Sequence, residues 1–79
     1  MRIDKYLKVS RIIKRRTVAQ EACDQGKVTV NGKVAKAGQN VKIGDIIEVT
    51  FGERVLRAEI LSVAEHVLKD EAKEMYKPL

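Results

Sequence analysis

The sequence has few of the residues that build disulfides, metal sites and aromatic binding surfaces. It contains one cysteine, one histidine and no tryptophan, and aromatic residues make up 4% of the chain. Cys23 has no second cysteine for an internal disulfide and no suitably spaced base, so we interpret it as a small buried hydrophobic residue. His66 has no cysteine or second histidine with which to bind zinc. The sequence therefore predicts no metal and no cofactor, and its low aromatic content argues against a base-stacking sheet.

Long apolar runs and catalytic motifs are also absent. The first residues do not form the apolar core of a signal peptide, and no stretch is long enough to cross a bilayer. The basic N-terminal part is not a long amphipathic helix, which argues against a membrane surface as the partner. No paired carboxylates, nucleophile–base pair or glycine-rich phosphate loop is found. We therefore expect a cytoplasmic protein that is not an enzyme and does not bind membranes.

Positive charge is concentrated in the first half of the chain. The net charge is +5, and residues 1–45 carry 11 Lys and Arg against 4 Asp and Glu. Residues 46–79 carry 5 against 7, so the second half is slightly acidic. A cationic face of this kind is typical of a protein that binds a polyanion. The length of 79 residues suits one domain with one small core.

Two short helices are predicted ahead of a sheet. Residues 2–9 place Ile3 and Leu7 on one face at i, i+4 spacing. Residues 15–25 form the second helix, and Gly26 ends it because glycine readily takes a positive φ. The apolar stripe of this second helix consists of Val18, Ala19, Ala22 and Cys23.

After Gly26 the apolar period changes to two, which predicts strands. Val28 to Val34 forms a hairpin that turns at Asn31-Gly32. Further strands are expected over 46–51 and 55–63, joined by a turn at 52–54, with Phe51 in the core. Residues 67–76 return to helical spacing, with Leu68, Ala72, Met75 and Tyr76 on one face and Pro78 as the stop. The predicted fold class is α+β: two packed N-terminal helices on a small, mostly antiparallel sheet, plus a C-terminal helix.

Four segments in a fixed order carry a family resemblance. They are RIDKYL at residues 2–7, Arg15-Arg16 with Ala19, GKVTVNG at residues 26–32 and VKIGD at residues 41–45. Together they resemble the alpha-L RNA-binding motif of the S4 domain. The resemblance implies a single S4-type domain over residues 1–79, with the motif core at about 1–48 and a C-terminal strand and helix at about 54–77. Arg15 stands where many members have a serine cap, which weakens inference from versions appended to enzymes.

The stand-alone architecture, with LKVSRIIKRRT joining the two helices, is similar to a narrower group. These are the small heat-shock-induced ribosome-binding proteins and their relatives called RqcP. The resemblance implies binding to large-subunit ribosomal RNA and peptidyl-tRNA on stalled large subunits, in support of alanine tailing by RqcH of the NEMF family. A heat-shock ribosome recycling factor, a general structured-RNA or tRNA binder, and a module that meets an acidic protein remain alternatives. We expect a monomer.

Arg16 is the leading candidate for RNA contact. It opens the second helix, where free backbone N–H groups favour phosphate, and its guanidinium can bind phosphate with two hydrogen bonds. Asp4 is expected to orient a neighbouring arginine, and Tyr6 to be partly buried rather than stacked on a base. The alternatives are a solvated surface arginine for Arg16, a flexible basic loop for the cations between the helices, and protection of strand edges against aggregation for the exposed lysines. The full set of predicted RNA-binding residues is Arg2, Lys5, Lys8, Arg11, Lys14, Arg15, Arg16, Gln20, Lys27, Lys33 and Lys36.

Overall fold

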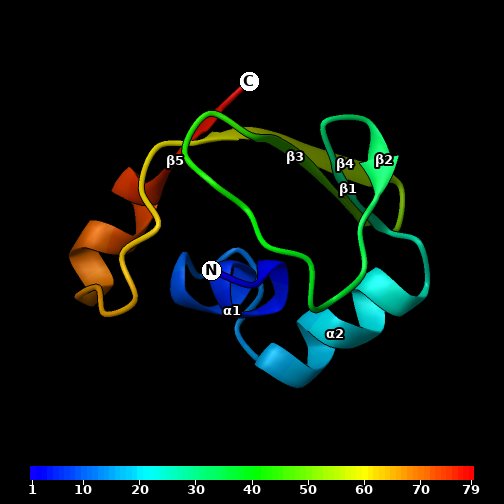
Figure 1. The fold of residues 1–79 in the computed structure, drawn as a ribbon, viewed down its shortest axis with the longest axis horizontal. Helices are drawn as coiled ribbons and strands as arrows, with labels where there is room; N and C mark the ends of the chain where they lie inside the picture. The colour runs from blue at the N-terminus through cyan, green and yellow to red at the C-terminus, as the bar shows by residue number, and fades with distance from the viewer.

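The computed structural model describes residues 1–79 and places two helices against one side of a five-stranded sheet (Figure 1). The sheet order is β2-β1-β3-β4-β5, and every neighbouring pair is antiparallel. No helix is long and apolar enough to cross a membrane. The elements in chain order are α1 (Ile3–Val9), α2 (Arg16–Asp24), β1 (Val28–Val30), β2 (Lys33–Val34), β3 (Ile46–Phe51), β4 (Arg54–Ile60), the 3-10 helix η1 (Lys69–Met75) and β5 (Tyr76–Pro78).

The core lies between the helices and the inner face of the sheet. Alternate strand residues point to this face because side chains in a strand have a period of two. The register pairs Val28 with Val49 and Ile47 with Ala58, and all four side chains are fully buried. From the helices, the core receives Ile3, Tyr6, Leu7, Ala19 and Cys23. These observations confirm the predicted α+β class and the buried position of Cys23.

Local backbone chemistry sets the turns between the first elements. Gly26 follows α2 with a φ of 74°, and Asn31 and Gly32 have φ values of 52° and 84° between β1 and β2. A left-handed pair at these two positions gives the turn whose twist matches a β-hairpin. The predicted helix stop and hairpin turn are therefore confirmed.

The C-terminal part differs from its prediction. The helix is a 3-10 helix that ends at Met75, and Tyr76–Pro78 then forms β5 at the edge of the sheet. Pro78 pairs with Ala58 rather than stopping a helix. An edge strand tolerates proline because the missing N–H can face outward. Strand β4 also differs from the predicted strand over 55–63, because it starts at Arg54 and ends at Ile60.

Three apolar residues were wrongly predicted to be interior. Phe51 and Val18 are exposed, and Leu68 is 74% exposed. Helix α2 approaches the sheet through the small side chains of Ala19 and Cys23, so its buried stripe is too narrow to include Val18. Phe51 is the last residue of β3, and with Val18 it lines a surface cleft of about 440 Å³. Tyr76, predicted on the same helix face as Leu68, is half-buried against the core cluster.

Candidate nucleic-acid interface

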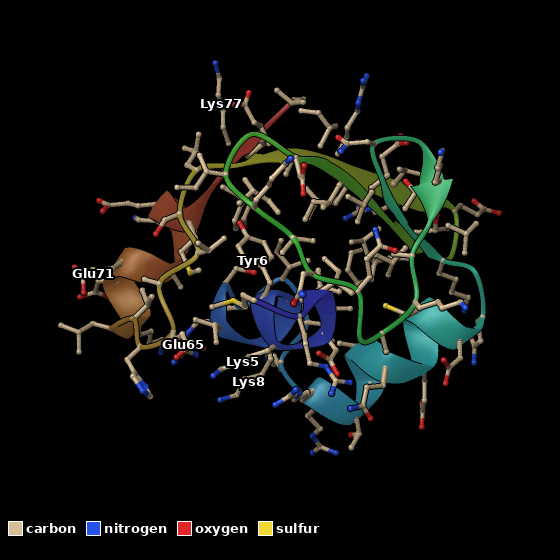
Figure 2. The ribbon with its side chains drawn as sticks, viewed as in Figure 1. Lys5, Tyr6, Lys8, Glu65, Glu71 and Lys77 are labelled. Carbon is tan, nitrogen blue, oxygen red and sulfur yellow. The ribbon has the colours of Figure 1, made fainter.

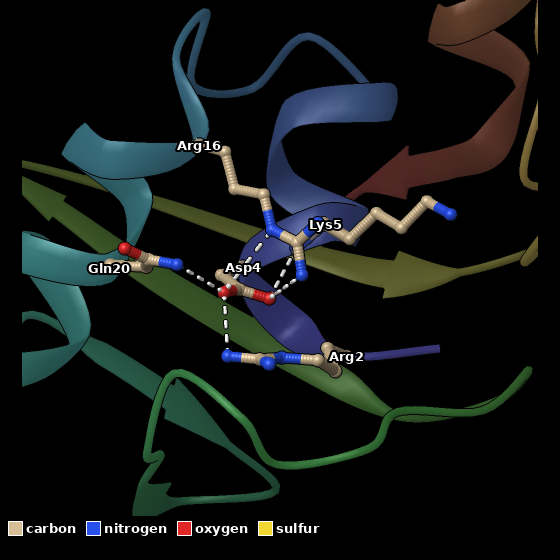
Figure 3. Close-up of polar contacts among 5 residues, drawn as sticks. All are labelled: Arg2, Asp4, Lys5, Arg16 and Gln20. Carbon is tan, nitrogen blue, oxygen red and sulfur yellow. Dashed lines mark hydrogen bonds and ion pairs between the residues drawn. The ribbon is translucent and has the colours of Figure 1, made fainter.

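A buried carboxylate joins the two N-terminal helices. Asp4 of α1 is 0% exposed, and its Oδ2 atom lies 3.1 Å from Arg2 Nη2 and 3.4 Å from Arg16 Nε. The side chain of Gln20 in α2 donates to Oδ2 at 3.0 Å, and the Lys5 backbone N–H donates to Oδ1 at 2.7 Å. Figure 3 shows these contacts converging on the one carboxylate. We call Arg2, Asp4, Arg16 and Gln20 the Asp4 cluster.

The arginines of the Asp4 cluster contact the buried carboxylate on one side and are exposed to solvent on the other. The side chains of Arg2 and Arg16 are 49% and 42% exposed, whereas the carboxylate beneath them is fully covered. A guanidinium has five N–H donors, so the contacts to Asp4 leave donors free to meet a phosphate. Since the side chains are already ordered, less conformational entropy is lost when they bind. The predicted role of Asp4 in orienting arginine is confirmed for both.

The loop after β2 completes the cluster on the Arg2 side. Ile3 N–H donates to the Gln39 carbonyl at 2.8 Å, and Arg2 forms a backbone bridge with Asn40. The Arg2 guanidinium lies against Gly38, where an added Cβ would be 3.6 Å from Nη2. The loop therefore fixes the start of α1 and supports one face of Arg2. Sequence reasoning placed no function at Gly38, because the contact is long-range and leaves no local pattern.

Opposing effects set the charge state of Asp4. Burial alone would raise the pKa of its carboxyl group. Hydrogen bonds from Gln20, the Lys5 backbone and Arg16, together with the charge of Arg16, outweigh burial and lower the pKa below its ordinary 3.8. Asp4 is therefore ionised at neutral pH, and its negative charge holds the arginines in place.

A second group of predicted cations lies beside the C-terminal segment. Lys8, Arg11 and Lys14 line a cleft of about 530 Å³ at the end of α1. Arg11 adopts a φ of 64° in the short connection to α2, a left-handed conformation that is uncommon for residues other than glycine. Glu65 and Glu71 line the same cleft, so its charge is mixed. We call it the α1 cleft.

Lys5 joins neither group of free cations. Its Nζ atom pairs with Glu65 Oε1 at 3.3 Å, across 60 residues of sequence. Tyr6, its neighbour, is fully buried, and its hydroxyl donates to the Met75 carbonyl at 2.8 Å. Burial, and then the nearby Tyr76, raise the pKa of Tyr6, so the hydroxyl stays protonated as a donor. Tyr6 is thus a structural residue, as predicted, and is more deeply buried than expected.

The other predicted cations are dispersed. Arg15 is exposed just before α2 and lies next to the Asp4 cluster in the chain. Lys27 lines the apolar cleft with Phe51, and Lys33 lies in a cleft bounded by the β1–β2 hairpin. Lys36 is exposed in the loop after β2. Of the predicted residues, the structure therefore brings Arg2, Arg16 and Gln20 together around Asp4, and Lys8, Arg11 and Lys14 together in the α1 cleft.

The fold and this centre define a class of protein. Arginines fixed over two packed helices, on a small α+β scaffold with excess positive charge, make a polyanion-binding module. A family model described as "S4 domain" matches residues 1–47. The chain belongs to the S4 domain family, as the sequence resemblance predicted.

Relatives cover nearly the whole chain. A protein of Halalkalibacterium halodurans named "RQC P-site tRNA stabilizing factor" is 57% identical over 76 residues, covering 96% of this chain and 86% of the relative. A Listeria monocytogenes protein of the same name is 53% identical over 76 residues, covering 96% and 83%. A trimeric structure of Heat Shock Protein 15 from Vibrio cholerae matches with a TM-score of 0.92 and 30% identity, covering 100% of this chain and 81% of that one. The predicted similarity to the stand-alone group is confirmed.

Proposed function

We propose that this chain is a non-enzymatic RNA-binding factor of ribosome-associated quality control. It acts as a single S4-type domain, monomeric and cytoplasmic, on large ribosomal subunits that still hold a peptidyl-tRNA. It contacts large-subunit ribosomal RNA and the P-site tRNA together and stabilises the tRNA. In this way it supports alanine tailing of the stalled nascent chain by RqcH.

One observation carries this proposal. The chain aligns over 96% of its length, at 57% identity, with a protein named for stabilising the P-site tRNA. The Asp4 cluster supplies a physical basis, because two arginines at fixed positions can bridge phosphates of a folded RNA without reading its sequence. Stabilising a tRNA requires holding, not chemistry, and a non-enzymatic factor suffices for that.

Co-sedimentation in sucrose gradients tests the proposal. Lysates containing the wild type, Arg16→Ala or Arg54→Ala are fractionated, and tRNA and nascent chains are probed in each fraction. Arg54 is exposed at the start of β4, so its loss removes one charge away from the Asp4 cluster. We expect the wild type and Arg54→Ala to sediment with large subunits that carry peptidyl-tRNA, and Arg16→Ala to move to the top of the gradient.

The fold of each variant is checked by circular dichroism, because Arg16 contacts a buried group. Wild-type protein that stays at the top of the gradient would refute the ribosome assignment. Equal loss of binding in the two arginine variants would show that charge alone, rather than the Asp4 cluster, holds the RNA. With purified protein, the slope of affinity against salt gives the number of cations that meet phosphates; if six to eight do so, affinity falls roughly 10³-fold or more between 50 and 200 mM salt.

A heat-shock ribosome recycling factor is the second candidate. The structural match to Heat Shock Protein 15, at a TM-score of 0.92, favours it. The two functions differ in what accompanies the protein on the ribosome. Alanine-tailed nascent chains that disappear when the protein is removed support quality control. Unchanged tailing, with accumulation of free large subunits after heat shock, supports recycling.

A further inference from the structure

The C-terminal segment forms an acidic wall beside the basic helices. Glu65 precedes η1 and pairs with Lys5, while Glu71 lies within η1. The wall is anchored, because Tyr6 donates to the Met75 carbonyl and the Met75 side chain is buried in the core. In Figure 2 Glu65 lies near Lys5 and Lys8, whereas Glu71 lies further out on η1, at the left edge of the view. Glu65 therefore lies beside Lys5, and both carboxylates line the same cleft as Lys8, Arg11 and Lys14.

The wall changes what the α1 cleft presents to a polyanion. Lys8, Arg11 and Lys14 line it together with Glu65 and Glu71, so a phosphate that approaches the cations also approaches the carboxylates. Two unit charges about 4 Å apart interact by roughly 1 kcal/mol even in water. At this cleft the attraction of the cations is offset. At the Asp4 cluster the carboxylate also balances part of the positive charge, but it is covered, so a phosphate meets the guanidinium groups before it meets the carboxylate.

We propose that Glu65 and Glu71 are specificity-determining residues, which repel the backbone of non-cognate RNA from the α1 cleft and confine binding to the Asp4 cluster. The inference rests on the proposed RNA-binding function. Non-specific RNA binding grows with the number of cations that can meet phosphates. Cognate binding depends on a few groups held in fixed positions. Repulsion that prevents three cations from meeting phosphates therefore weakens non-specific binding and has little effect on the affinity for cognate RNA.

Charge-neutral variants test this inference. Glu65→Gln, Glu71→Gln and the double variant are compared with Glu53→Gln, a matched charge change at the exposed turn between β3 and β4. The probes are a polyuridylate oligonucleotide, as non-cognate RNA, and purified large ribosomal subunits carrying peptidyl-tRNA. Affinities are measured from 50 to 200 mM salt.

The double variant is expected to bind polyuridylate about tenfold more tightly than the wild type at low salt. Its affinity should also depend more steeply on salt, because about two more phosphates can then be neutralised. Binding to the large subunit should change by less than about threefold, so the specificity ratio falls. Glu53→Gln should leave the ratio unchanged. Glu65 is 63% exposed, so loss of its ion pair should scarcely affect folding.

Either of two results for the double variant would overturn the inference. Polyuridylate binding by the double variant that matches Glu53→Gln would show that the wall does not act on RNA. Equal strengthening with both probes would show a general charge effect without specificity. A wild type that binds neither probe would refute the proposed function, and the inference with it. Wild-type binding to the subunit with no response to the wall variants refutes the inference alone.

Discussion

The Asp4 cluster and the α1 cleft both combine cations with carboxylates, yet they differ in where the carboxylates lie. In the Asp4 cluster the carboxylate is buried beneath Arg2 and Arg16, so a phosphate meets the guanidinium groups first. In the α1 cleft Glu65 and Glu71 are exposed on the facing wall. The comparison teaches that burial decides whether an acid helps or hinders polyanion binding. A covered acid orients its cations, whereas an exposed acid competes with the ligand.

Removing one carboxylate from each region should give opposite results. Asp4→Asn raises the net charge by one, as Glu65→Gln does. We expect Asp4→Asn to lower the affinity for large subunits about tenfold, because both arginines lose their charged anchor, and to destabilise the fold by about 2 kcal/mol. Glu65→Gln should instead raise the affinity for polyuridylate. Filter binding and urea unfolding measure these effects. An Asp4→Asn variant that binds more tightly would show that net charge governs binding.

The lowered pKa of Asp4 predicts a loss of stability in acid. A carboxyl group with a depressed folded pKa contributes stability that is fully present above its unfolded pKa, ordinarily 3.8. This contribution is lost as the pH falls below that value towards the lower folded pKa. We expect the free energy of unfolding to drop more in the wild type than in Asp4→Asn as the pH falls from about 5 towards 2.5. Urea unfolding at each pH measures this difference. Free energies of unfolding that decrease equally with pH in the two proteins would contradict the expectation.

Local chemistry made part of this fold predictable. The hairpin depends on Asn31-Gly32 and the helix stop on Gly26, whose backbone preferences are properties of the residues themselves. Strand β5 was missed because Tyr76–Pro78 is held by pairing with β4, and nothing in its own sequence alternates. The exposure of Phe51 depends on how far α2 reaches over the sheet, which periodicity does not reveal.

The candidate site was predictable to a similar degree. The sequence indicated Arg2, Arg16 and Gln20 as binding residues and Asp4 as an orienting group, and the fold joins all four. It placed Arg11 and Lys14 in the connection between the helices, but it did not predict that Glu65 and Glu71 line the same cleft. The pairing of Lys5 with Glu65 could not be predicted, because the two residues are 60 positions apart and neither lies in a motif with the other.

Exchanging cation types should distinguish the two regions further. Arg16→Lys keeps the charge but replaces a planar fork that spans Asp4 with a flexible ammonium group. We expect it to weaken binding to large subunits about fivefold, since fixed geometry is lost. Lys8→Arg in the α1 cleft should change binding by less than about twofold, because no geometry is fixed there. Competition binding with labelled wild type measures both. Equal changes in affinity for Arg16→Lys and Lys8→Arg would show that the geometry of the cation matters no more in the Asp4 cluster than in the α1 cleft.

The smallest expected effect depends on the background in which it is measured. Lys14→Gln alone should weaken polyuridylate binding by less than about twofold, because on our proposal Glu65 and Glu71, which line the same cleft, offset part of its attraction for phosphate. The control is Lys77→Gln in β5, which Figure 2 shows on the side of the molecule opposite Lys8, another residue of the α1 cleft. When both glutamates are changed to glutamine, the same Lys14→Gln substitution should cost about threefold or more, since the cation is then free to meet a phosphate. This non-additivity distinguishes a Lys14 that is only solvated from one whose charge is offset by the glutamates. If Lys14 is only a solvated surface residue, Lys14→Gln reduces RNA affinity by the same factor in both backgrounds. If the glutamates offset its charge, the substitution reduces RNA affinity more once both glutamates are changed to glutamine.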